Sequence, residues 1–170
     1  GGRAVGTAGT VKLLWDLHQK NGSLPWPKLL QPAIALANNG FRVSPRLAGA
    51  VARDQKRLST DSETQAYFFP DKQAISAGML LRNRSYAMSL LALSEHGGNY
   101  FYRKEFAQAI VDKVRHSKNP GLLEVADFSR YEVKERAANC SGYRQYKVCG
   151  MGPPSSGAIA VNQILGILET

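Results

Sequence analysis

The sequence contains few cysteines and histidines and no long apolar run. Its 170 residues include 2 Cys and 3 His. Two cysteines are too few for a disulfide-rich scaffold, and His18, His96 and His116 are too widely spaced for a zinc site. The longest apolar stretches, 158–161 and 164–168, are far shorter than the roughly 20 residues of a membrane-spanning helix. We therefore expect no metal, no cofactor and no membrane span in this segment.

Several familiar motifs are also missing. The first residues lack the charged and long apolar regions of a signal peptide, so none is expected within this segment. The sequence has no Gly-x-Ser-x-Gly elbow and no P-loop, and Gly97-Gly98 follows a predicted helix, where a phosphate-binding turn would follow a strand. These absences argue against a serine-hydrolase elbow and a nucleotide site.

Acidic residues are scarce, with 13 Asp and Glu against 22 Lys and Arg, a formal charge of +9. The basic residues are scattered and form no tract, and no nucleic-acid motif accompanies them. Solvated helix faces therefore explain the charge better than nucleic-acid binding does. Two alternatives remain open, a basic binding module without catalytic activity and a segment whose more acidic remainder lies elsewhere.

Hydrophobic residues make up 44% of the chain, which suits a single globular segment over 1–170 with one core. Apolar periodicity, with Gly and Pro at the joints, predicts helices over about 10–20, 27–39, 45–58 and 83–96, and a further one around 106–114. A short helix within 59–71 is expected to pack Tyr67, Phe68 and Phe69 into the core, with a ligand-stacking platform as the alternative.

The C-terminal part predicts a hairpin and one last helix. Alternation over 131–136 and a β-rich pattern over 143–148 indicate two antiparallel strands, with Ser141-Gly142 as the turn. A helix over 158–169 follows, with four core candidates: Ile159, Ile164, Leu165 and Leu168. The fold class is therefore mainly α with a small antiparallel β-hairpin. Because the chain stops inside an apolar helix, we expect the polypeptide to continue beyond Thr170.

Few residues offer chemistry, and structural roles explain most of them. Ser155 and Ser156 lie in a strand-to-helix turn whose N–H groups could bind an anion, but the expected role of Ser156 is to cap the next helix. Glu124 and Asp127 mark a predicted helix start, where capping explains them better than acid–base catalysis. His18 shares the stripe of Leu14, which favours a packed histidine. From these residues alone, function is not readable.

Four stretches resemble one family in the same order along the chain. The loop 152–158, Gly-Pro-Pro-Ser-Ser-Gly-Ala, with its following helix, resembles the Pro-Pro-Ser-Ser-Gly-Gly loop and helix in the large subunit of gamma-glutamyltranspeptidases. Residues 6–11, Gly-Thr-Ala-Gly-Thr-Val, are similar to that family's Gly-x-Pro-Gly-Thr-Val helix opening. Residues 26–41 and 143–148 resemble its next helix and its hairpin. The resemblance covers essentially the whole chain.

The resemblance implies the helical part of an N-terminal-nucleophile hydrolase, a four-layer αββα fold, and an internal fragment of the large subunit. The whole enzyme would cleave gamma-glutamyl amides such as glutathione and transfer the glutamyl group to water or amino acids. Its partners would be the remainder of the precursor, including the small nucleophile-bearing subunit, and a small gamma-glutamyl substrate. An acylase of the same fold with another amide substrate is the alternative.

Departures from the family pattern limit what this segment can do. Ala8 stands where the family has Pro, and Ala158 stands where it has a second Gly. No Thr-Thr-His or Thr-Ser-His nucleophile motif occurs here, and Arg3 is not in the family's Asp-x-Arg-Glu context. We therefore assign no catalytic or substrate-binding residue and expect the segment alone to be inactive.

The family's usual compartment bears on the two cysteines. Members are commonly periplasmic or secreted, so the resemblance implies an oxidising environment for the whole protein. The hairpin puts Cys140 and Cys149 on strands that could face each other. Strand register decides whether the sulfurs meet, so bonded and free forms both stay open.

Overall fold

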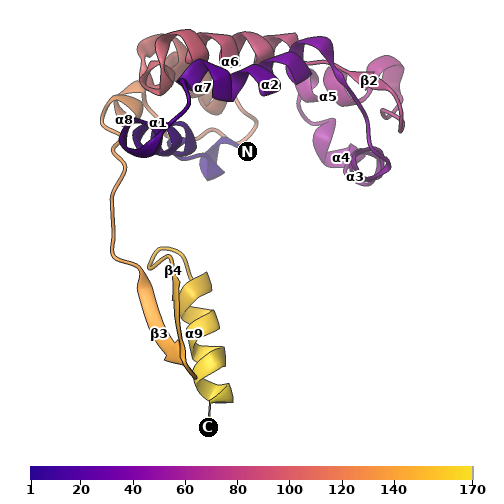
Figure 1. Ribbon diagram of the computed structural model, residues 1–170. Helices are drawn as coiled ribbons and strands as arrows, with labels where there is room; N and C mark the ends of the chain where they lie inside the picture. The colour runs from indigo at the N-terminus through magenta and orange to yellow at the C-terminus, as the bar shows by residue number, and fades with distance from the viewer. Residues whose placement is uncertain (170) are drawn as a thin grey trace. The chain divides into compact units, whose positions relative to one another are not determined.

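The computed structural model describes residues 1–169, which divide into two compact units. The helical unit spans Gly1–Tyr131, and the hairpin unit spans Glu132–Thr170. Figure 1 shows the first from indigo to orange and the second from orange to yellow. The single segment expected from the sequence stays a prediction about the domain organisation of the longer protein.

The helical unit contains most of the secondary structure. Its α-helices are α1 (Thr10–Asn21), α2 (Trp26–Asn39), α3 (Pro45–Arg53), α4 (Gln55–Leu58), α5 (Ser62–Phe68), α6 (Arg84–His96), α7 (Lys104–Arg115) and α8 (Val125–Ser129). Three short 3₁₀ segments, Gly2–Ala4, Pro70–Lys72 and Gly98–Tyr102, and two short strands, β1 (Phe41–Arg42) and β2 (Leu80–Leu81), complete it. The predicted mainly α fold class is confirmed.

Helix boundaries follow the capping residues that the sequence offers. Ser44 accepts a hydrogen bond from the Leu47 amide at 3.1 Å at the start of α3, and Asn83 accepts one from the Tyr86 amide at 2.9 Å at the start of α6. The single helix expected over 45–58 is wrong, because Asp54 leaves helical geometry (φ −95°, ψ 12°) and separates α3 from α4.

The first core cluster joins α3 to the chain around the short β1–β2 ladder. Its buried members are Val43, Val51, Phe69, Ile75 and Leu81. Tyr67 and Phe68 are half-buried against this cluster, so the prediction that 67–69 pack into the core is confirmed. The β1–β2 ladder itself, which pairs Phe41 with Leu81, was not predicted, because two-residue strands carry no periodicity.

The second core cluster joins α7 to α8. Ala107, Val111 and Val114 form the buried face of α7 and pack with Leu123 and Phe128. Glu124 and Asp127 form a reciprocal capping box at the start of α8, with the Glu124 amide donating to the Asp127 carboxylate at 2.8 Å. The capping role predicted for this pair is confirmed.

Helices α2 and α6 pack side by side (Figure 1). Helix α1 adds an aromatic contact to the same region. The Trp26 indole donates to the Leu93 carbonyl at 2.8 Å, and the Trp15 and Trp26 rings meet edge to face at 5.0 Å. Gly98 is required here, because a Cβ at this position would lie 2.4 Å from the Trp15 Cβ. Leu14, which was expected on the packed face of α1, is exposed.

The hairpin unit consists of β3 (Asn139–Tyr143), β4 (Tyr146–Gly150) and α9 (Gly157–Leu168). An antiparallel hairpin is confirmed, but its predicted position is wrong. Residues 131–136 form no strand, and Ser141-Gly142 lies inside β3. The turn is at Arg144-Gln145, because Tyr143 pairs with Tyr146 and Arg144 adopts a positive φ of 52°.

One side of α9 packs on the hairpin, where Ile159 and Leu165 are half-buried. A side chain at Gly150 would lie 2.8 Å from the Ala158 Cβ, so the glycine makes room for the start of α9. Ile164 and Leu168 are exposed, so their predicted place in the core is wrong within this unit.

Candidate functional site

The loop between β4 and α9 carries the two serines that the sequence singled out. Gly152 is buried and its carbonyl accepts from the Ser155 amide at 3.1 Å, across a cis Pro153–Pro154 peptide. Both serines are exposed. The loop therefore presents its two hydroxyl groups to solvent.

The expected capping role of the Ser156 hydroxyl is wrong. Ser156 occupies the N-cap position, but its side chain accepts no hydrogen bond from the described part of α9. Its backbone is already helical (φ −90°, ψ −13°), whereas a capping serine such as Ser44 is extended (φ −75°, ψ 156°) and can turn its oxygen toward the helix amides.

The nucleophile alternative for the two serines also lacks support in the geometry. An activated serine needs a base within hydrogen-bonding distance of its hydroxyl group. Within residues 1–169, neither Ser155 nor Ser156 has a side-chain hydrogen bond to a histidine, lysine or carboxylate. The described loop thus contains no nucleophile–base pair.

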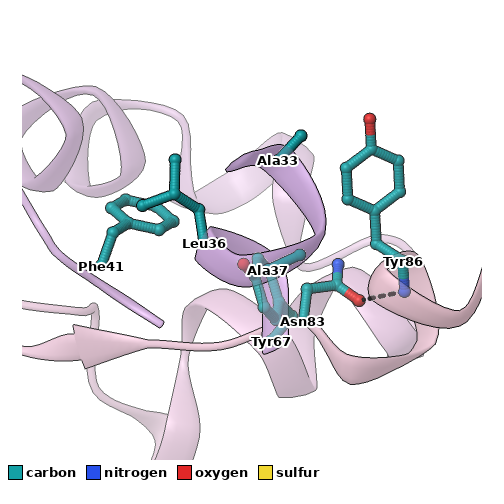
Figure 2. A pocket seen from close by; sticks show the side chains of 7 residues that line it. All are labelled: Ala33, Leu36, Ala37, Phe41, Tyr67, Asn83 and Tyr86. Carbon is teal, nitrogen blue, oxygen red and sulfur yellow. Dashed lines mark hydrogen bonds between the residues drawn. The ribbon is translucent and has the colours of Figure 1, made fainter. Parts of the chain in front are cut away.

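A shallow apolar pocket of about 480 Å³ lies on the helical unit (Figure 2). Ala33, Leu36 and Ala37 come from α2, and Asn83 and Tyr86 come from the start of α6; Phe41 and Tyr67 complete the lining. The Asn83 side-chain oxygen is occupied by its cap hydrogen bond to the Tyr86 amide. Burial raises the pKa of the Tyr67 hydroxyl group above its ordinary value. These side chains suit apolar contact and offer no base for acyl transfer.

A cluster of charged side chains connects two helices of the helical unit. Lys113 on α7 contacts the Asp61 carboxylate at 2.7 Å and the Glu63 carboxylate at 2.8 Å. The Lys113 ammonium, and next the Thr64 amide, lower the pKa of Asp61 from 3.8 to about 2. Since Asp61 also caps α5 through the Thr64 amide, this cluster ties α5 to α7.

His18 is packed, as its position on the helix predicts. Its ring is half-buried between Trp15 and Trp26, with centroids 6.1 and 5.2 Å away, and Nε2 lies 2.8 Å from the Leu24 carbonyl oxygen.

Over the described residues, no three His, Cys, Asp or Glu side chains gather in a way that could hold a metal ion. None of the described helices has the length and apolar character to cross a membrane.

The two cysteines face each other across the hairpin. Cys140 and Cys149 are direct register partners on β3 and β4, with Cα atoms 4.1 Å apart, and the structure joins them in a disulfide. The Arg144-Gln145 turn sets the strand register that the sequence left open, because it pairs Tyr143 with Tyr146. Cys140 lies three residues before Tyr143 and Cys149 lies three residues after Tyr146, so the two cysteines are paired as well.

Comparison with known proteins decides the family. The gamma-glutamyltranspeptidase family model matches residues 1–170. The chain belongs to the gamma-glutamyltranspeptidase family. It is 35% identical over 98% of its length to the glutathione hydrolase proenzyme of Escherichia coli K12, and 34% identical over 99% to the acylase ACY 1 proenzyme of Pseudomonas sp. strain V22.

A crystal structure of this family matches the fold. The chain aligns over 99% of its length with the gamma-glutamyltranspeptidase of Helicobacter pylori, at a TM-score of 0.92 and 32% identity. The expected relation to the N-terminal-nucleophile hydrolase fold is therefore confirmed. The chain spans 28% and 30% of the lengths of the Escherichia coli and Pseudomonas proenzymes, and 48% of the Helicobacter pylori chain.

Proposed function

We propose that these residues form part of the large subunit of an enzyme that cleaves gamma-glutamyl amides such as glutathione and passes the glutamyl group to water or an amino acid. The observation that carries this proposal is the match of the family model to the whole chain. The 35% identity to a glutathione hydrolase supports the same substrate class. The segment's own contribution is structural, through its helices and the 152–157 loop.

The proposed chemistry belongs to the complete precursor. A threonine at the start of the small subunit, outside these residues, attacks the gamma-glutamyl carbonyl, and its own amine accepts the hydroxyl proton. An oxyanion hole stabilises the tetrahedral intermediate, which expels the leaving amine and forms a glutamyl ester. Water or an amino acid then attacks the ester and restores the threonine. Without that residue, the 170-residue segment alone is inactive.

We propose a periplasmic or secreted location for the whole protein. The Cys140–Cys149 disulfide supports it, because disulfides persist in oxidising compartments and are rare in the cytosol. The remainder of the precursor, including the nucleophile-bearing small subunit, is the proposed partner. Two of the matched relatives are called proenzymes, and this chain covers only 30% and 28% of their lengths, which supports a longer precursor here too.

An acylase acting on a different amide is the second candidate. The 34% identity to the acylase ACY 1 proenzyme favours it. The two candidates differ in the acyl group that the site accepts, and that choice is made outside the described residues.

Two anilide substrates separate the candidates. Gamma-glutamyl-p-nitroanilide and glutaryl-p-nitroanilide differ only by the α-amino group of the acyl chain. We expect the complete precursor to cleave the glutamyl compound faster by a factor of about 10 or more, and an amino-acid acceptor to accelerate p-nitroaniline release. Preference for the glutaryl compound would establish the acylase instead.

The 170-residue chain is the matched control, and we expect no p-nitroaniline release from it. If the complete precursor cleaves neither substrate but binds a polyanion with a steep salt dependence, the basic binding module replaces both enzyme candidates.

A further inference from the structure

Helix α9 carries apolar residues on two sides. The side that carries Ala158, Ile159 and Leu165 is half-buried against the hairpin. A second side carries Val161, Ile164 and Leu168, which are 47%, 57% and 63% exposed. These three residues follow one another by three and four positions, so they form one continuous stripe along the helix. We call Val161, Ile164 and Leu168 the outer stripe.

The polar residues of α9 do not produce a solvated face. No charged residue occurs between Gly157 and Leu168. Asn162 faces the hairpin, where its side chain donates to Asn139 at 3.3 Å. A helix that is apolar all round is typical of one that is buried on both sides.

Helix α7 provides an internal comparison in the same chain. Its Ala107, Val111 and Val114 are buried, while Asp112 and Arg115 are exposed. This is the pattern of a helix with one packed side and one solvated side. The apolar outer stripe is therefore a specific feature of α9, because α7 in the same chain carries charged residues on its outer side.

We infer that the outer stripe is an internal docking surface for an apolar helix or sheet face from the part of the precursor that lies outside residues 1–170. The matched proenzymes are long enough to contain such a segment. This chain matches them along nearly its full length, yet it covers only 28–30% of their length. In the Helicobacter pylori structure, more than half of the matching chain lies outside the aligned part. The inference rests on the proposed precursor and is independent of its substrate.

A second copy of the chain is a poorer occupant. A helix of 12 residues is about 18 Å long and about 10 Å wide, so one side offers a footprint of roughly 200 Å². Stable interfaces between separate proteins bury about 800 Å² per partner. A segment of the same polypeptide needs far less area, because its local concentration is set by the chain itself.

The test compares one substitution in two lengths of polypeptide. Ile164→Asp places a charge in the outer stripe, and Gln163→Asp places the same charge on the next residue, which is exposed and outside the stripe. In the complete precursor, we expect Ile164→Asp to lower the thermal midpoint by about 5 °C or more and Gln163→Asp to shift it by less than about 1 °C. In the 170-residue chain, both substitutions should shift the midpoint by less than about 1 °C.

A milder variant covers the case in which the Ile164→Asp precursor does not fold. Ile164→Ala should lower the midpoint of the complete precursor by about 2 °C or more and leave the 170-residue chain unchanged. Dye binding supplies a second readout: the 170-residue chain should bind anilinonaphthalene sulfonate through the outer stripe, and Ile164→Asp should reduce that fluorescence.

Three outcomes would overturn the inference. Small shifts in both lengths would mean that the stripe stays solvated, and equal large shifts in both would mean that residues 1–170 cover it themselves. A concentration-dependent dimer of the 170-residue chain that Ile164→Asp abolishes would assign the stripe to a second copy. Because these readouts are midpoints, masses and fluorescence, a precursor that fails to cleave gamma-glutamyl-p-nitroanilide would contradict the proposed function and leave the docking result intact.

Discussion

Different interactions stabilise the helical unit and the hairpin unit, each within itself. The helical unit buries two apolar clusters, whereas every large apolar side chain described in the hairpin unit keeps part of its surface in contact with solvent. The hairpin unit instead has a disulfide across its two strands and a helix against them. With fewer than about 40 residues, it is too small to bury a sufficient core alone. The Cys140–Cys149 disulfide and the proposed contact of the outer stripe with the rest of the precursor compensate for the small core.

The largest expected effect breaks the core of the helical unit. Phe128 on α8 is 1% exposed and contacts the rings of Phe101 and Tyr102. Phe128→Ala should lower the free energy of unfolding by about 3–5 kcal/mol, because it removes buried surface and leaves a cavity. Urea unfolding followed by far-UV circular dichroism measures the loss. Leu122→Ala, at a position that is 88% exposed, is the control and should change stability by less than about 0.5 kcal/mol.

The next effect concerns the hairpin unit alone. Replacing Cys140 and Cys149 together by Ser removes a link between residues 9 apart in sequence, and should cost about 2–3 kcal/mol of local stability. Hydrogen exchange read by mass spectrometry should show faster exchange over 139–150 and unchanged exchange over 104–115. Faster exchange in both segments would show that the two units unfold as one.

The free-thiol titre checks the premise of that experiment. Denatured chain should show thiols only after reduction, because both cysteines are bonded. Equal titres with and without reductant would remove the covalent difference between the two units.

A smaller effect distinguishes two serines at equivalent positions. Ser44 accepts a hydrogen bond from the start of α3, so Ser44→Ala should cost about 1 kcal/mol. Ser156 holds the same position on α9 without accepting such a bond from its described amides, so Ser156→Ala should cost less than about 0.5 kcal/mol. Paired denaturation curves compare the two. Equal costs would show that Ser156 caps α9 in solution.

The smallest effect concerns an exposed ion pair. Lys113→Gln should raise the pKa of Asp61 from about 2 toward 3.8, because the ammonium group is the largest cause of the lowered value. The folded pKa lies below the unfolded one, so the stabilisation from Asp61 is present above about pH 4 and is lost as the pH falls toward 2. A carboxyl-carbon NMR titration measures the midpoint. An unchanged midpoint in the variant would leave the Thr64 amide as the main cause.

The sequence predicted the helices best where a capping residue and a periodic stripe coincide. Ser44-Pro45 and Asn83 mark helix starts that the structure places within one residue. The α3–α4 break was missed, because Asp54 is a residue type compatible with a helix and its backbone angles (φ −95°, ψ 12°) are not encoded by periodicity.

The hairpin illustrates a competing local pattern. Gly142 marks a turn in the sequence, yet it pairs with Lys147 inside the ladder, and Arg144 takes the positive φ at the turn. Pairing of Tyr143 with Tyr146 fixes this register, and a cross-strand pair is invisible to a scan along one strand. The loop serines were placed correctly next to α9, but their hydroxyl geometry depends on backbone angles that residue types do not determine.

The placement of the tryptophans has a spectroscopic consequence. Both tryptophans of the chain, Trp15 and Trp26, lie in one cluster of the helical unit. Indole emission therefore reports only on α1, α2 and the end of α6, and the hairpin unit contributes tyrosines alone. A protein whose hairpin unit has melted will keep a native emission maximum, so fluorescence and hydrogen exchange will disagree whenever the two units lose their structure at different temperatures.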